Sequence, residues 1–186
     1  MKYLGTKEIE TNRLILRKFK IEDCDAMFNN WANDIDVCRY LTWHPHGSIN
    51  ETKDIINFWI NNYDKNTFYQ WAIELKEINE VIGSISVVNL NDELKLVEIG
   101  YCISKKYWRK GITTEALNRL IKFFFEEIKV NIIACKHCIE NPNSGKVMEK
   151  AGMKFEGILR QRAISISGIC DMAMYSILKD EYFKGV

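Results

Sequence analysis

The chain has 186 residues, 47% of them hydrophobic, and its 26 Lys and Arg side chains nearly balance 25 Asp and Glu. That length and apolar content exclude general disorder and a small disulfide-stapled scaffold, and they predict one domain that spans residues 1–186. A net charge of +1 excludes a global attraction to nucleic acid or to an anionic membrane, so a local patch must meet any charged ligand.

Hydrophobic periodicity and turn residues divide the chain into helices and strands. Ser48 and Glu51 fit a capping box, and apolar residues at helical spacing mark 113–128 as the strongest helix. The three strand-like runs between residues 68 and 104 are so close that only antiparallel hairpins can join them. In chain order we expect a strand at 10–17, a helix at 21–33, a loop at 43–47, a helix from 48 to about 63, strands at 68–75, 81–90 and 94–104, a helix at 113–128, a strand at 131–139, a helix at 143–151, and strands at 155–164 and 171–178.

This order predicts an α+β fold, with a mixed, mostly antiparallel sheet flanked by about four helices. The helix at 113–128 connects the strands at 94–104 and 131–139. The two strands of such a strand, crossover helix and strand unit are predicted to be parallel, with a right-handed connection.

The segment 107–117 lies between a predicted strand and the strongest predicted helix. Gly111 lets successive backbone N–H groups point into one concavity, the helix dipole adds to them, and Arg109 and Lys110 supply full charges. This segment would suit a diphosphate. The alternative is that Gly111 only eases the turn and that both basic side chains are solvated.

Four segments together resemble the GNAT superfamily of acetyl-CoA-dependent N-acetyltransferases. They are 98–103 (EIGYCI), 108–117 (WRKGITTEAL), 140–144 (ENPNS) and 149–153 (EKAGM). Their order and spacing match the family over nearly the whole chain, and residues 10–17 (ETNRLILR) resemble the opening of the branch of ribosomal-protein alanine and serine N-acetyltransferases. The resemblance implies a GNAT-like fold in which the parallel strand pair splays apart.

The resemblance also implies acetyl-CoA as co-substrate, and it assigns a binding role to two backbone segments and one side chain. The pantetheine arm would pair with the backbone of 101–103 and bond to the side chain of Asn141; the alternative for Asn141 is simple helix capping before Pro142. Trp108 and Thr113 depart from the family pattern, but binding should survive because the contacts are mainly backbone amides. The residues so assigned are Tyr101, Cys102, Ile103, Arg109, Lys110, Gly111, Ile112, Thr113, Thr114 and Asn141.

Acetyl transfer to an amine needs a base and a stabilised leaving thiolate. Glu98 is the predicted base, since the two-residue strand period places it on the face of Gly100 and Cys102. The alternative is a solvated edge carboxylate. The resemblance implies Ser144 as general acid, because Met148 stands where many GNAT enzymes have a tyrosine, although a CoA thiolate can leave without an acid.

The loop between the first two helices borders the acceptor cleft in this fold, so Trp43, His44 and His46 are predicted to shape substrate access. The alternative is a core tryptophan with two solvated histidines. No metal site is predicted: Cys135 and Cys138 form a CxxC motif, but residues three apart on a strand face opposite sides.

The predicted activity is acetyl transfer from acetyl-CoA to a primary amine, first of all a protein N-terminal amine, by direct attack on the thioester. Two alternatives stay open: acetylation of a small amine such as a polyamine, amino acid or antibiotic, and an acyl-CoA sensor without turnover. No nucleic-acid or membrane partner is expected. No signal or membrane segment is visible, so we expect a cytoplasmic protein with reduced cysteines. For the oligomeric state we expect a monomer or a homodimer.

Overall fold

The computed structural model describes residues 1–185, within which eight strands form one sheet in the order β1-β2-β3-β4-β5-β6-β8-β7. The strands are β1 (Ile9–Glu10), β2 (Leu14–Arg17), β3 (Gln70–Leu75), β4 (Glu80–Asn91), β5 (Leu96–Ile103), β6 (Ile132–Cys138), β7 (Lys154–Ser165) and β8 (Gly168–Leu178). The α-helices of the same residues are α1 (Cys24–Met27), α2 (Ile35–Cys38), α3 (Ile49–Ile60), α4 (Ile112–Phe123), α5 (Pro142–Lys150) and α6 (Lys179–Lys184). The α+β class is confirmed.

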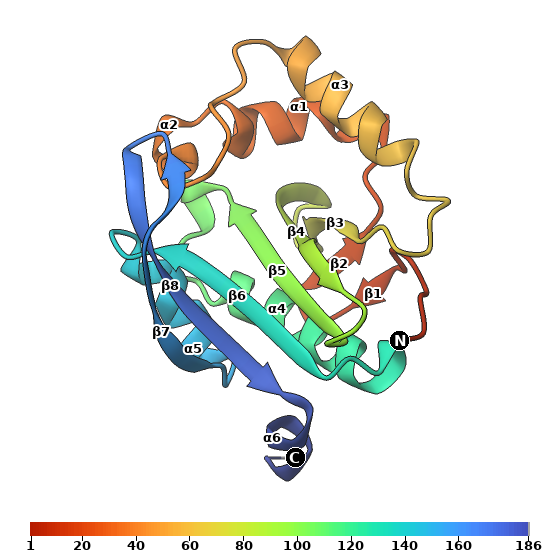
Figure 1. Ribbon diagram of the computed structural model, residues 1–186. Coiled ribbons are helices and arrows are strands. Elements are labelled where there is room, and N and C mark those ends of the chain that lie inside the picture. The colour runs from red at the N-terminus through yellow and green to blue at the C-terminus, as the bar shows by residue number, and fades with distance from the viewer. Residues whose placement is uncertain (186) are drawn as a thin grey trace.

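The sheet is antiparallel except between β5 and β6, as the crossover rule predicted. These two strands pair only where Leu96–Glu98 lies against residues 132–134. Beyond Glu98 they diverge, which Figure 1 shows as a gap that widens toward the end of β5. The parallel pair and its splay are therefore both present.

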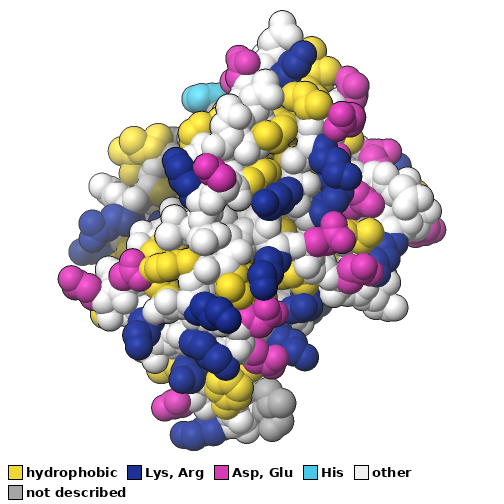
Figure 2. Space-filling model, turned by 90° about the vertical axis from the view of Figure 1, so that its right-hand side faces the viewer, with side chains coloured by type: hydrophobic (Ala, Val, Ile, Leu, Met, Phe, Trp, Pro, Cys, Tyr) yellow, Lys and Arg dark blue, Asp and Glu magenta, His cyan; other side chains and the backbone are white. Residues whose placement is uncertain are grey.

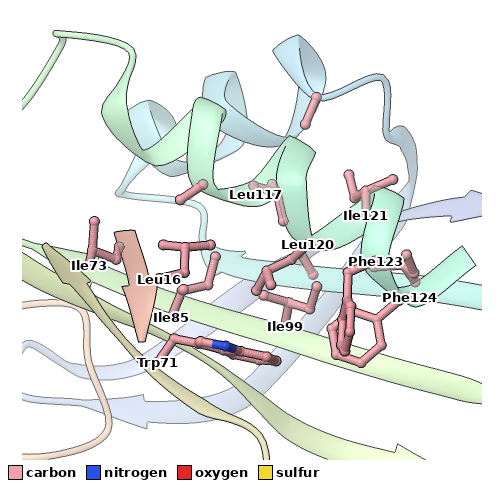
Figure 3. Packing of buried hydrophobic residues seen from close by; sticks show 14 of the residues in the cluster. Leu16, Trp71, Ile73, Ile85, Ile99, Leu117, Leu120, Ile121, Phe123 and Phe124 are labelled. Atoms are coloured by element: carbon pink, nitrogen blue, oxygen red, sulfur yellow. The ribbon is translucent and has the colours of Figure 1, made fainter. Parts of the chain in front are cut away.

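Helices cover both faces of the sheet (Figure 1). The short helix α1 and helix α3 pack on one face, around Trp31 and Ile56. Helix α4 covers the other face, where Leu117, Leu120 and Phe124 point at strand residues such as Trp71 (Figure 3). The apolar stripe predicted for 113–128 is buried as expected, and its last turn continues as a π-helical segment, Phe124–Ile128.

Six α-helices lie in residues 1–185, two more than the four predicted. The additional ones are α2 and α6, of four and six residues. Helices this short span too few turns for a hydrophobic stripe to appear in the sequence. The one sequence signal for α2 is its N-cap residue, Asp34. Its side chain accepts a hydrogen bond of 2.8 Å from the backbone N–H of Asp36.

Several predicted boundaries differ: the helix expected at 21–33 is a 3-10 turn, the short α1 and a π-helical segment, and β8 begins at Gly168. Two others are wrong for clear local reasons. The expected strand at 10–17 is a two-strand hairpin, because Thr11 turns the chain and its hydroxyl accepts from the N–H of Leu14 at 2.9 Å. Helix α3 ends at Ile60 rather than near 63. Tyr63 leaves the helix because its hydroxyl accepts from the N–H of Phe19 and donates to the carbonyl of Gln70, each at 2.9 Å.

The cysteines follow the strand period. Cys135 is buried beneath α4, whereas Cys138 packs on the other side of the sheet with Cys170 and Met172. All six cysteines are free thiols. Between residues 1 and 185, no helix is long and apolar enough to cross a membrane.

Candidate active site

A cavity of about 260 Å³ lies at the gap between β5 and β6. Its walls come from four places: the end of β5, the segment around α2, the turn before α4, and the start of α5. The lining residues are Asp36, Val37, Tyr40, Leu41, Tyr101, Cys102, Ile103, Trp108, Arg109, Thr113, Glu140, Asn141, Pro142, Asn143, Ser144 and Val147. Elements distant in sequence thus meet at the free edge of one strand.

The strand edge in this cavity has a definite polarity. The N–H of Ser104 donates to the carbonyl of Ile82 on β4, so the alternation of an antiparallel pair turns the polar groups of Tyr101 and Ile103 away from β4. Trp108 donates its indole N–H to the carbonyl of Ile103 at 3.0 Å. Trp108, which departs from the family pattern, therefore provides a donor for the carbonyl of Ile103. The N–H of Ile103 still faces the cavity.

The turn before α4 has the geometry of an anion nest. Arg109 and Gly111 both have left-handed backbone, with φ of 60° and 73°. Alternation of left-handed and ordinary residues directs successive N–H groups into one concavity. Helix α4 begins at Ile112, and the N–H groups of its first turn add to this site because they have no partner within the helix.

A second cavity of about 140 Å³ adjoins this turn. Arg109, Lys146 and Lys150 line it together with Thr113 and Thr114. Three cationic side chains beside a helix N-terminus form a donor set that fits a ligand with several phosphate groups.

Sequence reasoning missed Lys146 and Lys150. Their signal was readable, since Asn143, Lys146 and Lys150 recur at three- and four-residue steps and share one face of α5.

Lys110 does not line either cavity. Its ammonium lies 5.2 Å from the centre of the Tyr107 ring, in a cation–π contact. The backbone of Lys110 belongs to the turn, and its carbonyl accepts a hydrogen bond of 3.0 Å from Arg13.

Asn141 and Ser144 reach the cavity from the start of α5. Asn141 is the N-cap and Pro142 the first helical residue, but the Asn141 side chain makes no capping bond, so its amide remains available to a ligand. The Ser144 hydroxyl donates to the phenol oxygen of Tyr101 at 3.1 Å, and this phenol donates to the Ser144 carbonyl at 3.0 Å. Burial raises the pKa of Tyr101 well above its usual range.

Met148 is a buried residue of α5, and its neighbour Val147 faces the cavity instead. The residue at the position of the usual tyrosine therefore does not reach the cavity.

Glu98 is only 7% exposed and does not line the cavity. The ammonium of Lys136 lies 2.8 Å from its Oε1 and forms an ion pair with it. Cys102 does line the cavity, and burial raises the pKa of its thiol.

The loop with Trp43, His44 and His46 is not brought to this cavity, whose walls in that region are Tyr40 and Leu41. His46 is buried, with Nδ1 2.7 Å from the Thr52 hydroxyl and its ring 5.4 Å from that of Trp43. His46 thus contacts other residues of the protein, whereas it was predicted to shape substrate access.

His46 makes stability depend on pH. Burial lowers the pKa of its imidazole from 6.5, against a smaller opposing effect of Glu51. The unfolded chain then binds more protons as the pH falls below about 6.5, so the free energy of unfolding should decrease between pH 7.5 and 5.5. Urea unfolding at the two pH values measures this slope. The slope should shrink in His46→Asn and persist in the exposed-site variant His44→Asn; an equal slope in all three proteins would contradict the assignment.

No group of three or more His, Cys, Asp or Glu side chains in the described residues is arranged to hold a metal ion.

Comparison with known proteins gives a consistent match. Residues 13–154 match the family model described as an acetyltransferase (GNAT) domain. An uncharacterized N-acetyltransferase, p20 of Bacillus licheniformis, is 32% identical over 92% of this chain and 96% of its own length. The ribosomal-protein-serine acetyltransferase of Escherichia coli is 30% identical over 55% of this chain and 57% of its own. A solved GNAT-family acetyltransferase from Bacillus anthracis superposes with a TM-score of 0.83 at 28% identity, covering 94% of this chain and all of that one.

Proposed function

The chain belongs to the GNAT family of acetyltransferases, which use acetyl-CoA, and we propose that its acceptor is the N-terminal amine of a protein. The observation that carries this proposal is the cavity at the free edge of β5, which connects the anion nest before α4 with an acceptor side around α2. The name of the Escherichia coli relative, a ribosomal-protein-serine acetyltransferase, supports a protein acceptor.

The residues present fit CoA along its length. The amides at residues 111–114 and the side chain of Arg109 would hold the diphosphate, and Lys146 and Lys150 would meet further phosphate charge. The pantetheine arm would lie along Tyr101 and Ile103, within reach of Asn141. Acetyl-CoA would supply the thioester carbonyl that the amine attacks.

The chain's own groups would then move two protons. Glu98, reached through water, would accept the proton that the amine loses as its new N–C bond forms. As the C–S bond breaks, Ser144 would turn its hydroxyl from the Tyr101 oxygen and donate its proton to the sulfur, and the proton held by Glu98 would return to Ser144 through water. An N–H on the free edge of β5 would stabilise the charge on the carbonyl oxygen.

The acceptor side of the cavity carries the carboxylates of Asp36 and Glu140. Asp36 is paired with Lys105 and Arg39, and Glu140 accepts from the thiol of Cys138 at 2.6 Å. Because Asp36 already has two cationic partners, Glu140 is the carboxylate that would attract an ammonium group. Because it would also attract a polyamine, a small polycation is the second candidate acceptor.

An acceptor screen tests the proposal. The protein is incubated with acetyl-CoA and either peptides with free N-terminal Ser or Ala, the same peptides with blocked N-termini, or spermidine, and released thiol is measured. Thiol release with free peptides alone supports the proposal. Release with spermidine alone assigns the second candidate, and calorimetric CoA binding without release in any arm would identify an acyl-CoA sensor.

Glu98→Gln tests the base. If Glu98 accepts the amine proton, this variant should lower kcat/KM about a hundredfold at neutral pH. Lys136→Gln is the matched control, because it removes the same ion pair from the other side. Equal losses in the two variants would show that Glu98 matters only as the partner of Lys136.

A further inference from the structure

The N-terminal hairpin holds one carboxylate in the first turn of α4. Glu115 Oε1 accepts from the Thr11 hydroxyl at 2.6 Å and from the N–H of Arg13 at 2.9 Å, and Oε2 accepts from Arg13 Nε at 2.6 Å. Both oxygens are therefore fixed by residues about a hundred positions earlier in the chain. The resemblance of 10–17 to a family motif gave these residues no role.

Arg13 also reaches the anion nest from behind. Its Nη1 donates to the carbonyl of Lys110 at 3.0 Å, and its Nη2 lies 3.7 Å from the point where a Cβ on Gly111 would stand. A guanidinium is planar and rigid, so one side chain fixes the turn relative to the helix that follows it. Arg13 lines neither cavity and would not itself touch the ligand.

The contact with Lys110 has a consequence on the other side of the same peptide bond. In a planar trans peptide the C=O and the following N–H point in opposite directions. Because the carbonyl of Lys110 points at Arg13, the N–H of Gly111 points away from Arg13 and toward the concavity.

Charge supports the same arrangement. Glu115 is an acid in the first turn of α4, next to the proposed anion site, and its charge would repel a diphosphate if unpaired. Burial raises the pKa of Glu115, but the hydrogen bonds from Thr11 and Arg13 and the charge of Arg13 outweigh it, so that its pKa is lowered. The carboxylate stays ionised at neutral pH and is paired with Arg13.

We propose that Arg13 is a positioning residue which, with Thr11 and Glu115, holds the turn at 109–111 in its diphosphate-binding conformation. This inference rests on the proposed function, since it takes CoA as the ligand. The Arg13 side chain is 42% exposed, and exposed ion pairs contribute about 0–1 kcal/mol to folding, so its loss should affect binding more than stability. Figure 2 shows the side of the molecule at the right of Figure 1, over which acidic and basic side chains are interspersed.

The test compares two acetyl donors in Arg13→Gln. The KM for acetyl-CoA and the calorimetric Kd for CoA should rise about tenfold, with kcat changed less than twofold. With S-acetylpantetheine, which has no diphosphate, KM should change less than twofold. Lys154→Gln is the control: it removes an exposed ion pair with Glu181 that lies outside the hairpin and both cavities, and both donors should behave as with the wild type.

Thr11→Val keeps the Arg13 side chain but removes the hydroxyl that donates to Glu115 and accepts from the N–H of Leu14, so it should raise the Kd for CoA about threefold. This variant decides the question if Arg13→Gln fails to fold, which urea unfolding would reveal. An unchanged Kd for CoA in the variants, or an equal rise of KM for both donors, would overturn the positioning role. Absence of CoA binding by the wild-type protein would instead refute the proposed function.

Discussion

Thr113→Asp is expected to raise the KM for acetyl-CoA about a thousandfold while leaving the protein at least as stable as the wild type. Thr113 is the second residue of α4 and lines both cavities. A carboxylate about 4 Å from a phosphate charge costs about 4 kcal/mol at an effective dielectric constant near 20, which is about a thousandfold in affinity. The same charge in the first turn of a helix is favourable for folding. Steady-state kinetics and urea unfolding measure the two effects.

Asn50→Asp is a matched control for this variant. Asn50 is the second residue of α3, as Thr113 is of α4, and it is exposed away from both cavities. The substitution adds the same charge at an equivalent helix position, so it should leave KM unchanged. If Thr113→Asp retained the wild-type KM, the diphosphate would not bind at this turn.

Trp71→Ala is expected to lower the free energy of unfolding by about 4 kcal/mol. Trp71 is fully buried, and its ring centre lies 5.8 to 6.2 Å from those of Tyr69, Phe123 and Phe124 (Figure 3). Its indole N–H donates to the carbonyl of Lys7 at 2.6 Å. Truncation would remove this bond and leave a cavity between α4 and the sheet, which urea unfolding would detect.

Phe58→Ala provides the comparison for the core variant. Phe58 is 58% exposed on α3, and exposed substitutions usually change stability by less than about 0.5 kcal/mol. A loss for Trp71→Ala no larger than that for Phe58→Ala would mean that α4 does not depend on Trp71 for its packing.

Strong local patterns carried the prediction of the fold. The apolar stripe of α4 spans enough turns to be unambiguous, and the short polar links between β3, β4 and β5 leave only hairpins. Once α4 is a crossover, it returns the chain to the same end of the sheet, so β5 and β6 run parallel. These inferences need only local spacing, and the structure agrees with each of them.

The site was harder to predict because it is a meeting of distant segments. The turn at Gly111 could be recognised locally, since a glycine between a strand and a helix suggests a left-handed residue. The pairing of Glu98 with Lys136 and the burial of His46 against Thr52 depend on tertiary packing. Spacing along the chain does not determine such contacts.

The free edge of β5 has a consequence for what can enter the sheet. An unpaired strand edge invites another polypeptide strand to add to it, a common route to aggregation. The indole of Trp108 already occupies the carbonyl of Ile103, which such a strand would need for its ladder. The indole thus competes with strand addition at this residue, whereas the N–H of Ile103 stays free for a slender ligand.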